Sequence, residues 1–272
     1  NAADNNGDNV AVGYNTGASI TTGTQNVLLG NYAGDGMQVG QQNIAIGSFA
    51  LSADDAGDYS VAIGTFALSA QNAGSDGVDM YNTAVGHSAG ASVTTGAQNT
   101  IIGGLAGDAL NEGANNTFAG YSSGSAQTIG NFNVAYGHAA LATNVAANRN
   151  VAIGNNALFA MTASSSTDTY NTAVGFSAGL SITTGDKNTL IGGLTGDALT
   201  EGEKNVAIGY AALGSDQTGN KNTAIGFRAL NTLNNAGDTF NTAVGYDAGQ
   251  LISTGINNTI VGGLAGDAID TG

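Results

Sequence analysis

Cysteine, proline and tryptophan are all absent from this 272-residue sequence, and only 9% of its residues are charged. Without cysteine the chain can form no disulfide, no thiolate metal site and no thiol nucleophile. Without proline it cannot form a collagen helix, even though 44 of its residues are glycine. Hydrophobic residues make up 42% of the chain, which is too large a share for a disordered segment. The composition therefore indicates an ordered protein of unusual architecture.

Basic residues and long apolar runs are also scarce. Lysine and arginine number 5 against 20 acidic residues, which gives a formal net charge of −15. That charge repels phosphate backbones and anionic lipid, so the sequence predicts no nucleic-acid partner. No apolar run is long enough for a membrane-spanning helix, and we expect no membrane insertion. The last residues fall partway through a repeat, which predicts a segment of a longer chain.

A five-residue motif repeats along the whole chain: Asn, a β-branched residue, two mostly apolar residues and Gly. We call the first residue of each copy the anchor. Most anchors follow one another at a spacing of 17 residues, and the three longer spacings contain insertions. Repeats of this kind indicate a stacked, solenoid-like architecture over residues 1–272 as a single repeat domain. The anchors are Asn9, Asn26, Asn43, Ser60, Asn82, Asn99, Asn116, Asn133, Asn150, Asn171, Asn188, Asn205, Asn222, Asn241 and Asn258.

Each motif predicts one short strand that ends at its glycine. Seventeen residues are too few for a strand–helix–strand unit but suit one coil of an all-β parallel β-solenoid. We expect about fifteen coils, a second short strand near Ala89 and Ala157, and no long helix. Stacked anchor side chains predict an amide ladder. We assign structural roles to Asn26, Asn43, Asn82, Asn99, Asn150 and Asn205, and to Gly47, Gly86, Gly103, Gly154 and Gly209.

A longer pattern overlies the repeat. The eighth residue after each anchor is either Gly or Leu, in the order GGLL, GGGLL, GGLL, GG. In the first two Gly coils of each block, a large aliphatic residue such as Val93 or Leu110 follows three positions later. We expect the eighth-position leucine and this aliphatic residue to fill the same interior space.

The predicted strand is apolar on both faces. Side chains alternate along a strand, so the first and third positions after the anchor share one face and the second lies on the other. We expect the first and third positions inside the coil, including Ile153 and Ile208. The second position, alanine in ten coils and bulky in five, is then expected to contact another copy of the chain. The predicted chain–chain contacts are Leu28, Ile101, Phe118, Leu190 and Ile260.

The motif resembles the head repeats of the trimeric autotransporter adhesins, the YadA-like heads. Residues 43–47, 150–154 and 205–209 are close matches, and the resemblance extends over essentially the whole chain from Asn9. Similar repeats also resemble segments of phage tail fibres and of secreted surface proteins. The resemblance implies a left-handed β-roll in which three chains pack through one sheet, although the adhesin repeat is typically shorter than 17 residues.

Catalysis, calcium binding and ice binding are three more specific functions that the residues can be compared with. The two histidines, His87 and His138, lie in no nucleophile or metal motif, so we expect no enzyme. The Gly-Gly-Leu-Ala-Gly-Asp segment ending at Asp108 resembles calcium-binding repeats but lacks ligands in neighbouring coils. We therefore expect no cofactor and keep calcium as an alternative. Paired threonines occur once per block, too sparsely for a continuous ice-binding array, and ice binding is kept as a lesser alternative with calcium.

The insertions are candidate ligand-contact loops, and each ends in an aromatic residue just before an anchor: Tyr81, Tyr170 and Phe240. These rings could stack on a sugar or close the returning coil. We expect a non-enzymatic, extracellular fibre segment at a cell surface or on a virion. It would bind further copies of itself, as a trimer, and a surface or matrix ligand such as a glycan or protein. The alternative is a self-assembling filament subunit.

Overall fold

The protein is an all-β parallel solenoid, as the repeat predicts. The computed structural model describes residues 7–163 and 165–271, and these residues include no helix. None of the described residues therefore provides a helix that could cross a membrane. The chain divides into two compact units, residues 1–133 and 134–272. That the two form a single repeat domain stays a prediction.

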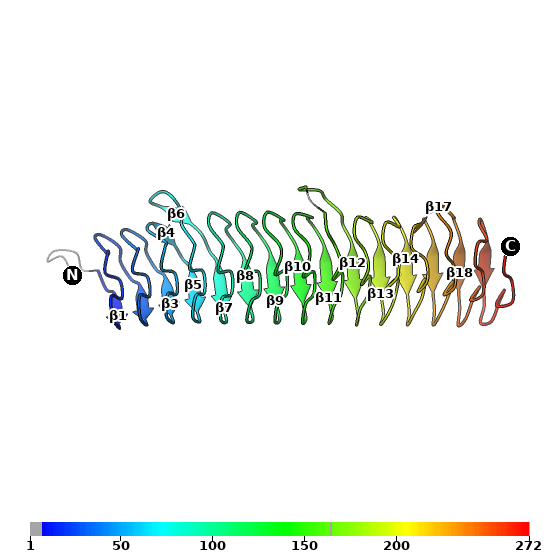
Figure 1. The fold of residues 1–272 in the computed structure, drawn as a ribbon, viewed down its shortest axis with the longest axis horizontal. Helices are drawn as coiled ribbons and strands as arrows, with labels where there is room; N and C mark the ends of the chain where they lie inside the picture. Colours follow the sequence, from blue (N-terminus) through cyan, green and yellow to red (C-terminus); the bar gives the residue numbers. More distant parts are fainter. Residues whose placement is uncertain (1–6, 164, 272) are drawn as a thin grey trace. The chain divides into compact units, whose positions relative to one another are not determined.

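In the first unit each anchor is followed by one three-residue strand, and these strands pair in parallel, position by position (Figure 1). Val27, for example, pairs with Val10 on one side and with Ile44 on the other. A loop from the following coil adds a short pair, β4 (Gly57–Asp58) with β6 (Val78–Asp79). The main strands are β1 (Val10–Val12), β2 (Val27–Leu29), β3 (Ile44–Ile46), β5 (Val61–Ile63), β7 (Thr83–Val85), β8 (Thr100–Ile102) and β9 (Thr117–Ala119).

The second unit repeats this arrangement with the same register. Its additional short pair is β15 (Gly219–Asn220) with β17 (Gly237–Asp238). An isolated bridge joins Asn148 to Asp168 at the second insertion. The main strands are β10 (Val134–Tyr136), β11 (Val151–Ile153), β12 (Thr172–Val174), β13 (Thr189–Ile191), β14 (Val206–Ile208), β16 (Thr223–Ile225), β18 (Thr242–Val244) and β19 (Thr259–Val261).

The anchor asparagines form the buried amide ladder that the sequence predicts. The Asn99 side-chain nitrogen donates to the carbonyl oxygen of Gly113 at 2.9 Å and to Oδ1 of Asn82 at 3.1 Å. Its own Oδ1 accepts from the backbone nitrogen of Asn116 at 3.0 Å. The anchor side chain thus bonds to the carbonyl group fourteen residues later in its own coil and to the anchors of the preceding and following coils. Because the side chain is fully buried, an apolar replacement would leave these groups unpaired.

Where the anchor is Ser60, the serine hydroxyl is too short to continue the ladder, and Gln71 replaces the missing amide. Gln71 Nε2 donates to Ser60 Oγ at 2.9 Å, and Gln71 Oε1 accepts from Asn82 Nδ2 at 2.8 Å. Gln71 also donates to the buried carboxylate of Asp54. The ladder is therefore kept intact at the root of the first insertion by a side chain from elsewhere in the same coil.

The glycine that ends each strand turns the chain at a corner where no side chain fits. Gly47 has φ +136°, and a Cβ there would lie 2.5 Å from the carbonyl oxygen of Gly64 in the next coil. The same positive φ recurs at Gly86, Gly103, Gly154 and Gly209. These glycines are structural, as the sequence predicts, because the neighbouring backbone occupies the space that any side chain would need.

The predicted second strand does not form. The segments around Ala89 and Ala157 are turns. The reason is backbone conformation, since Ser88 and Gly90 on either side of Ala89 are left-handed, with φ +54° and +58°. A left-handed residue cannot extend a strand. Successive coils still bond through these turns, for example from the Gly90 nitrogen to the Ala106 carbonyl oxygen at 2.9 Å.

The predicted orientation of the main strand is wrong: the second position points into the coil, and the first and third point out. Ile153, expected inside, is 38% exposed, and Ile208 is half-buried. The residues expected to contact another chain instead belong to the core of a single chain, where four are completely buried and the fifth, at the last anchor, is 8% exposed. They are Leu28, Ile101, Phe118, Leu190 and Ile260.

Glycine at the eighth position explains why bulky residues fit inside. A Cβ on Gly34 would lie 2.9 Å from Leu28 Cδ2, and one on Gly124 would lie 2.8 Å from the Phe118 ring. Where the eighth residue is leucine, as at Leu51, the second position is alanine. The buried eighth-position leucines and the buried aliphatic residues three positions later, such as Met37, all face the same interior, as expected.

Candidate interface on the outer strand face

The first positions of the main strands, which are valine, isoleucine or threonine, and the mostly aliphatic third positions form one partly exposed surface in each unit, which we call the outer strand face. In the second unit it carries Ile153 and Ile191, which are 38% and 39% exposed, beside half-buried neighbours such as Ile208 and Val174. Isolated exposed aliphatic side chains are ordinary, but rows along a stack of strands form a continuous patch. This surface is the one that the sequence had assigned to the core.

One edge of this face is the pre-anchor column, the residues immediately before each anchor. Four of the five basic residues of the sequence lie in it: Arg149, Lys187, Lys204 and Lys221. Each pairs with an acid of its own chain, for example Lys204 with Glu203 at 2.5 Å. The Glu203 carboxylate, through this hydrogen bond, raises the pKa of Lys204 above its usual value. The sequence analysis missed this column, although the clustering of basic residues before anchors was visible in the repeat.

The other edge is the post-glycine column, the two residues that follow each strand-ending glycine. In the second unit Tyr210, Phe227 and Tyr246 stack with ring centroids 5.6 and 5.2 Å apart. In the first unit Tyr32 stacks on Phe49 in the same way, with centroids 5.0 Å apart. Since adjacent rings cover one another's faces, a sugar would find mainly ring edges here. These columns therefore stabilise the stack and leave an aromatic border beside the outer strand face.

Comparisons with protein-family models, curated proteins and solved structures find no match. The resemblance to adhesin heads rests on the repeat motif alone.

The loop-ending aromatic residues pack on the preceding coil. The Tyr81 ring stacks on Tyr59, with centroids 5.0 Å apart, and its hydroxyl donates to Asp79 at 3.1 Å. Arg149 lies over the Tyr170 ring, and Lys221 lies 4.9 Å from the centre of the Phe240 ring. The three rings thus close the returning coil, although about half of each side chain stays exposed.

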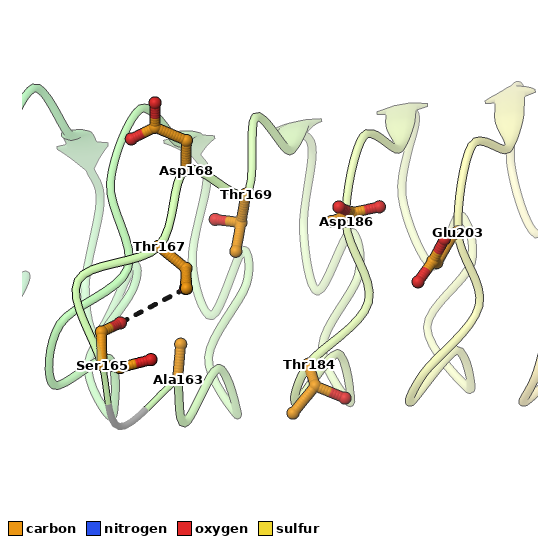
Figure 2. Close-up of a pocket in the computed structure, with 8 residues that line it drawn as sticks. All are labelled: Ala163, Ser165, Thr167, Asp168, Thr169, Thr184, Asp186 and Glu203. Carbon is orange, nitrogen blue, oxygen red and sulfur yellow. Dashed lines mark hydrogen bonds between the residues drawn. The ribbon is translucent and has the colours of Figure 1, made fainter.

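A polar hollow of about 330 Å³ lies beside the second insertion (Figure 2). Its acidic residues already bind groups of the same chain. Asp168 accepts from Arg149 Nε at 3.0 Å and from the Tyr170 hydroxyl at 3.1 Å, while Asp186 pairs with Lys187. Hydrogen bonds, first from Asn148 and then from Arg149, lower the pKa of Asp168. The hollow is lined by Ala163, Ser165, Thr167, Asp168, Thr169, Thr184, Asp186 and Glu203.

The remaining candidate residues do not converge. Burial raises the pKa values of Asp108 and Asp197, the acidic residues of two calcium-like segments. Among residues 7–163 and 165–271, no three acidic or histidine side chains meet as a possible metal site. His87 borders the aromatic column, where its ring meets Phe66 edge-on at 6.5 Å.

Proposed function

We propose that this chain is a non-enzymatic fibre segment at a cell surface or on a virion, in which three copies pack through their outer strand faces. One observation carries the proposal: aliphatic side chains are exposed in rows along the strands of both units. Soluble proteins seldom leave so continuous an apolar surface in water. The resemblance of the repeats to trimeric adhesin heads supports the same assembly.

The size of the surface suits a second copy of the chain. In the second unit every main strand offers two partly exposed side chains to this surface, and each partner of a standard interface buries about 800 Å². Burial of that area removes aliphatic groups from water, whereas the paired charges of the pre-anchor column stay at the rim. A glycan or protein ligand would then meet surfaces turned away from this contact, including the insertion loops.

Molar mass in solution tests the proposal. Size-exclusion chromatography with light scattering should give three times the 26.6 kDa chain mass for the wild type. Replacing Ile153 and Ile191 together with aspartate would place unpaired charges in the apolar contact, and the mass should fall to that of one chain. Leu251→Asp is the matched control, since Leu251 is an exposed aliphatic residue outside the outer strand face.

The outcomes are distinct. A wild-type monomer would refute the proposal, and so would an oligomer that Leu251→Asp disrupts as strongly as the double variant. Open polymers of no fixed mass would favour the filament alternative. Circular dichroism should show that each variant keeps its strands, because the substituted side chains already touch solvent.

A further inference from the structure

Two buried acids lie at the roots of the first and third insertions. Asp54 and Asp216 are each the eleventh residue after their anchor, a position that most other coils give to an apolar residue such as Met37. Both acidic side chains are completely buried, and each belongs to the coil just before an insertion-bearing coil. The equivalent residue before the second insertion is the neutral Asn144, which is also completely buried.

The Asp54 carboxylate joins its own coil to the first insertion. Its Oδ1 accepts from the backbone nitrogen of Gly57 at 3.0 Å, in the same coil, and from that of Ala73 at 3.3 Å, in the insertion. Its Oδ2 accepts from Nε2 of Gln71, the side chain that keeps the amide ladder intact. Loss of these bonds would free both the start of the insertion and the amide that replaces an anchor.

Asp216 repeats this arrangement at the third insertion. Its Oδ1 accepts from the backbone nitrogen of Gly219 at 2.9 Å, and its Oδ2 accepts from Nδ2 of the next anchor, Asn222, at 3.3 Å. The backbone of Asn235, within the insertion, also bonds to this carboxylate. One acid thus holds the turn of its own coil, the ladder and the inserted loop together.

We propose that Asp54 and Asp216 are proton-dependent tethers, which hold the first and third insertions to the coil when protonated and loosen as they ionise. Among the described residues, the groups that bond to both carboxylates are neutral amides. A buried charge that lacks a cationic partner is costly. Opening of the insertion gives the ionised carboxylate access to water and removes that cost, so ionisation favours the open state.

The charged neighbours of Asp54 act in the same direction, because they are acids. Asp58 experiences the charges of Asp79, Asp76 and Asp54, and burial followed by this repulsion raises the pKa of Asp58. Burial is also the main cause that raises the pKa of Asp54, against the hydrogen bonds from Gln71 and the backbone. Ionisation of Asp54 is therefore opposed by both burial and like charge.

At the third insertion burial raises the pKa of Asp216 from 3.8 to about 6, against the hydrogen bonds of the surrounding backbone amides. The charges that accompany the adjoining strands β15 and β17 are those of Lys221 and Asp238, which compensate one another in an ion pair. The closed state keeps its proton up to about pH 6, whereas the solvated carboxyl of the open state loses it near pH 3.8. The stabilisation is therefore complete below pH 4 and is lost as pH rises to 6.

This tethering would make two of the candidate ligand-contact loops sensitive to pH. The first and third insertions end in the exposed rings of Tyr81 and Phe240. Acidic surroundings would keep both loops on the coil, and neutral surroundings would let them open more often. Both acids are buried within a single chain, so the inference does not depend on the proposed assembly.

Native-state hydrogen exchange, corrected for the pH dependence of intrinsic exchange, tests the tethers at the amides of Ala73 and Asn235. At Asn235 the opening constant should rise on the order of 100-fold between pH 4 and pH 7, since one pKa unit is a tenfold change in proton affinity. Asp216→Asn should abolish this rise, and Asp54→Asn should abolish the corresponding rise at Ala73. The ratio between the two pH values separates this effect from any constant loss of stability in the variants.

The second insertion provides two controls. The Thr169 amide bonds within it and should show little pH dependence in the wild type. The Asn144 side chain accepts from the Ala147 nitrogen at 3.0 Å and donates to the Ala147 oxygen at 3.1 Å. A protonated aspartate can reproduce both bonds, whereas an ionised one cannot donate, so Asn144→Asp should make exchange at Ala147 pH-dependent.

Three results would overturn the inference. The first is a wild type in which neither Ala73 nor Asn235 responds to pH. The second is a pH response that persists in the Asp→Asn variants. The third is an equal rise at Thr169, which would mean that the entire chain is destabilised and that no insertion is released on its own. A wild-type monomer in light scattering would end the proposed assembly and leave the tethers unaffected.

Discussion

Replacing Leu28 with alanine and Gly34 with leucine tests whether the second and eighth positions share one interior volume. Leu28 is fully buried, and a Cβ built on Gly34 meets the Leu28 side chain at 2.9, 3.2 and 3.6 Å. Leu28→Ala alone should therefore leave a cavity and cost about 2–5 kcal/mol. Gly34→Leu alone should overpack the coil at a cost of about 1–3 kcal/mol, to which the left-handed backbone adds about 1–2 kcal/mol.

The double variant should be more stable than the sum of the two single-variant costs predicts. It would recreate a combination that the chain already uses at residues 152, 158 and 161, where Ala152, Leu158 and Met161 are all buried. Leu158 has φ +50° and Gly34 has φ +54°, so the new leucine adopts a backbone conformation that this fold accommodates. The remaining cost is the left-handed strain of a leucine, about 1–2 kcal/mol.

Native-state hydrogen exchange at β2 measures the local opening free energy for the wild type, both single variants and the double variant. We expect the double variant to lose no more than about 2 kcal/mol, against about 4–10 kcal/mol if the two costs simply add. An additive result would show that the two side chains do not compete for one space, and the explanation of the Gly–Leu pattern would fail.

Three further predictions concern the coil framework. Asn99→Ala should cost about 1–3 kcal/mol in urea unfolding, because it removes four ladder hydrogen bonds of a buried amide, and a loss near zero would contradict that role. Gly47→Ala should strongly lower the melting temperature, because its Cβ would meet the Gly64 carbonyl, whereas Gly193→Ala, whose Cβ would meet no atom closer than 3.6 Å, should change it little. Burial raises the pKa of Asp216 from 3.8 to about 6, so its stabilising protonated form is lost as pH rises toward 6. Asp216→Asn should therefore gain about 3 kcal/mol relative to wild type between pH 4 and pH 7, and a pH-independent difference would refute this.

The repeat made most of the architecture predictable. A constant spacing of anchor and glycine implies equivalent positions in stacked coils, and hence the strands, the amide ladder and the glycine corners. Alternation along the strand separates two faces, but it does not say which face is interior. Alanine at the second position looked too small to fill a core. In these coils the leucine six residues later occupies the same space and completes the core, as Ala45 and Leu51 show.

The decisive pattern was present in the sequence all the same. Bulky second-position residues such as Leu190 occur only in coils whose eighth residue is glycine. The second strand failed for another reason. The residues with left-handed backbone include Ser88 and Ala211, and nothing in the sequence distinguishes them from serines and alanines with ordinary backbone. The candidate interface therefore lies on the opposite face of the strand from the one predicted. It is still a largely apolar sheet surface, as the sequence predicts.

The pairing of glycine with bulky side chains constrains how the number of coils can change during evolution. A Gly on one coil accepts a side chain from the next, as Gly90 does for Ile101, so the loss of one coil would separate complementary partners. Recombination that adds or removes a complete block of Gly and Leu coils keeps every partner together. The heritable unit of growth is therefore the block, and sister genes should differ by four or five coils at a time.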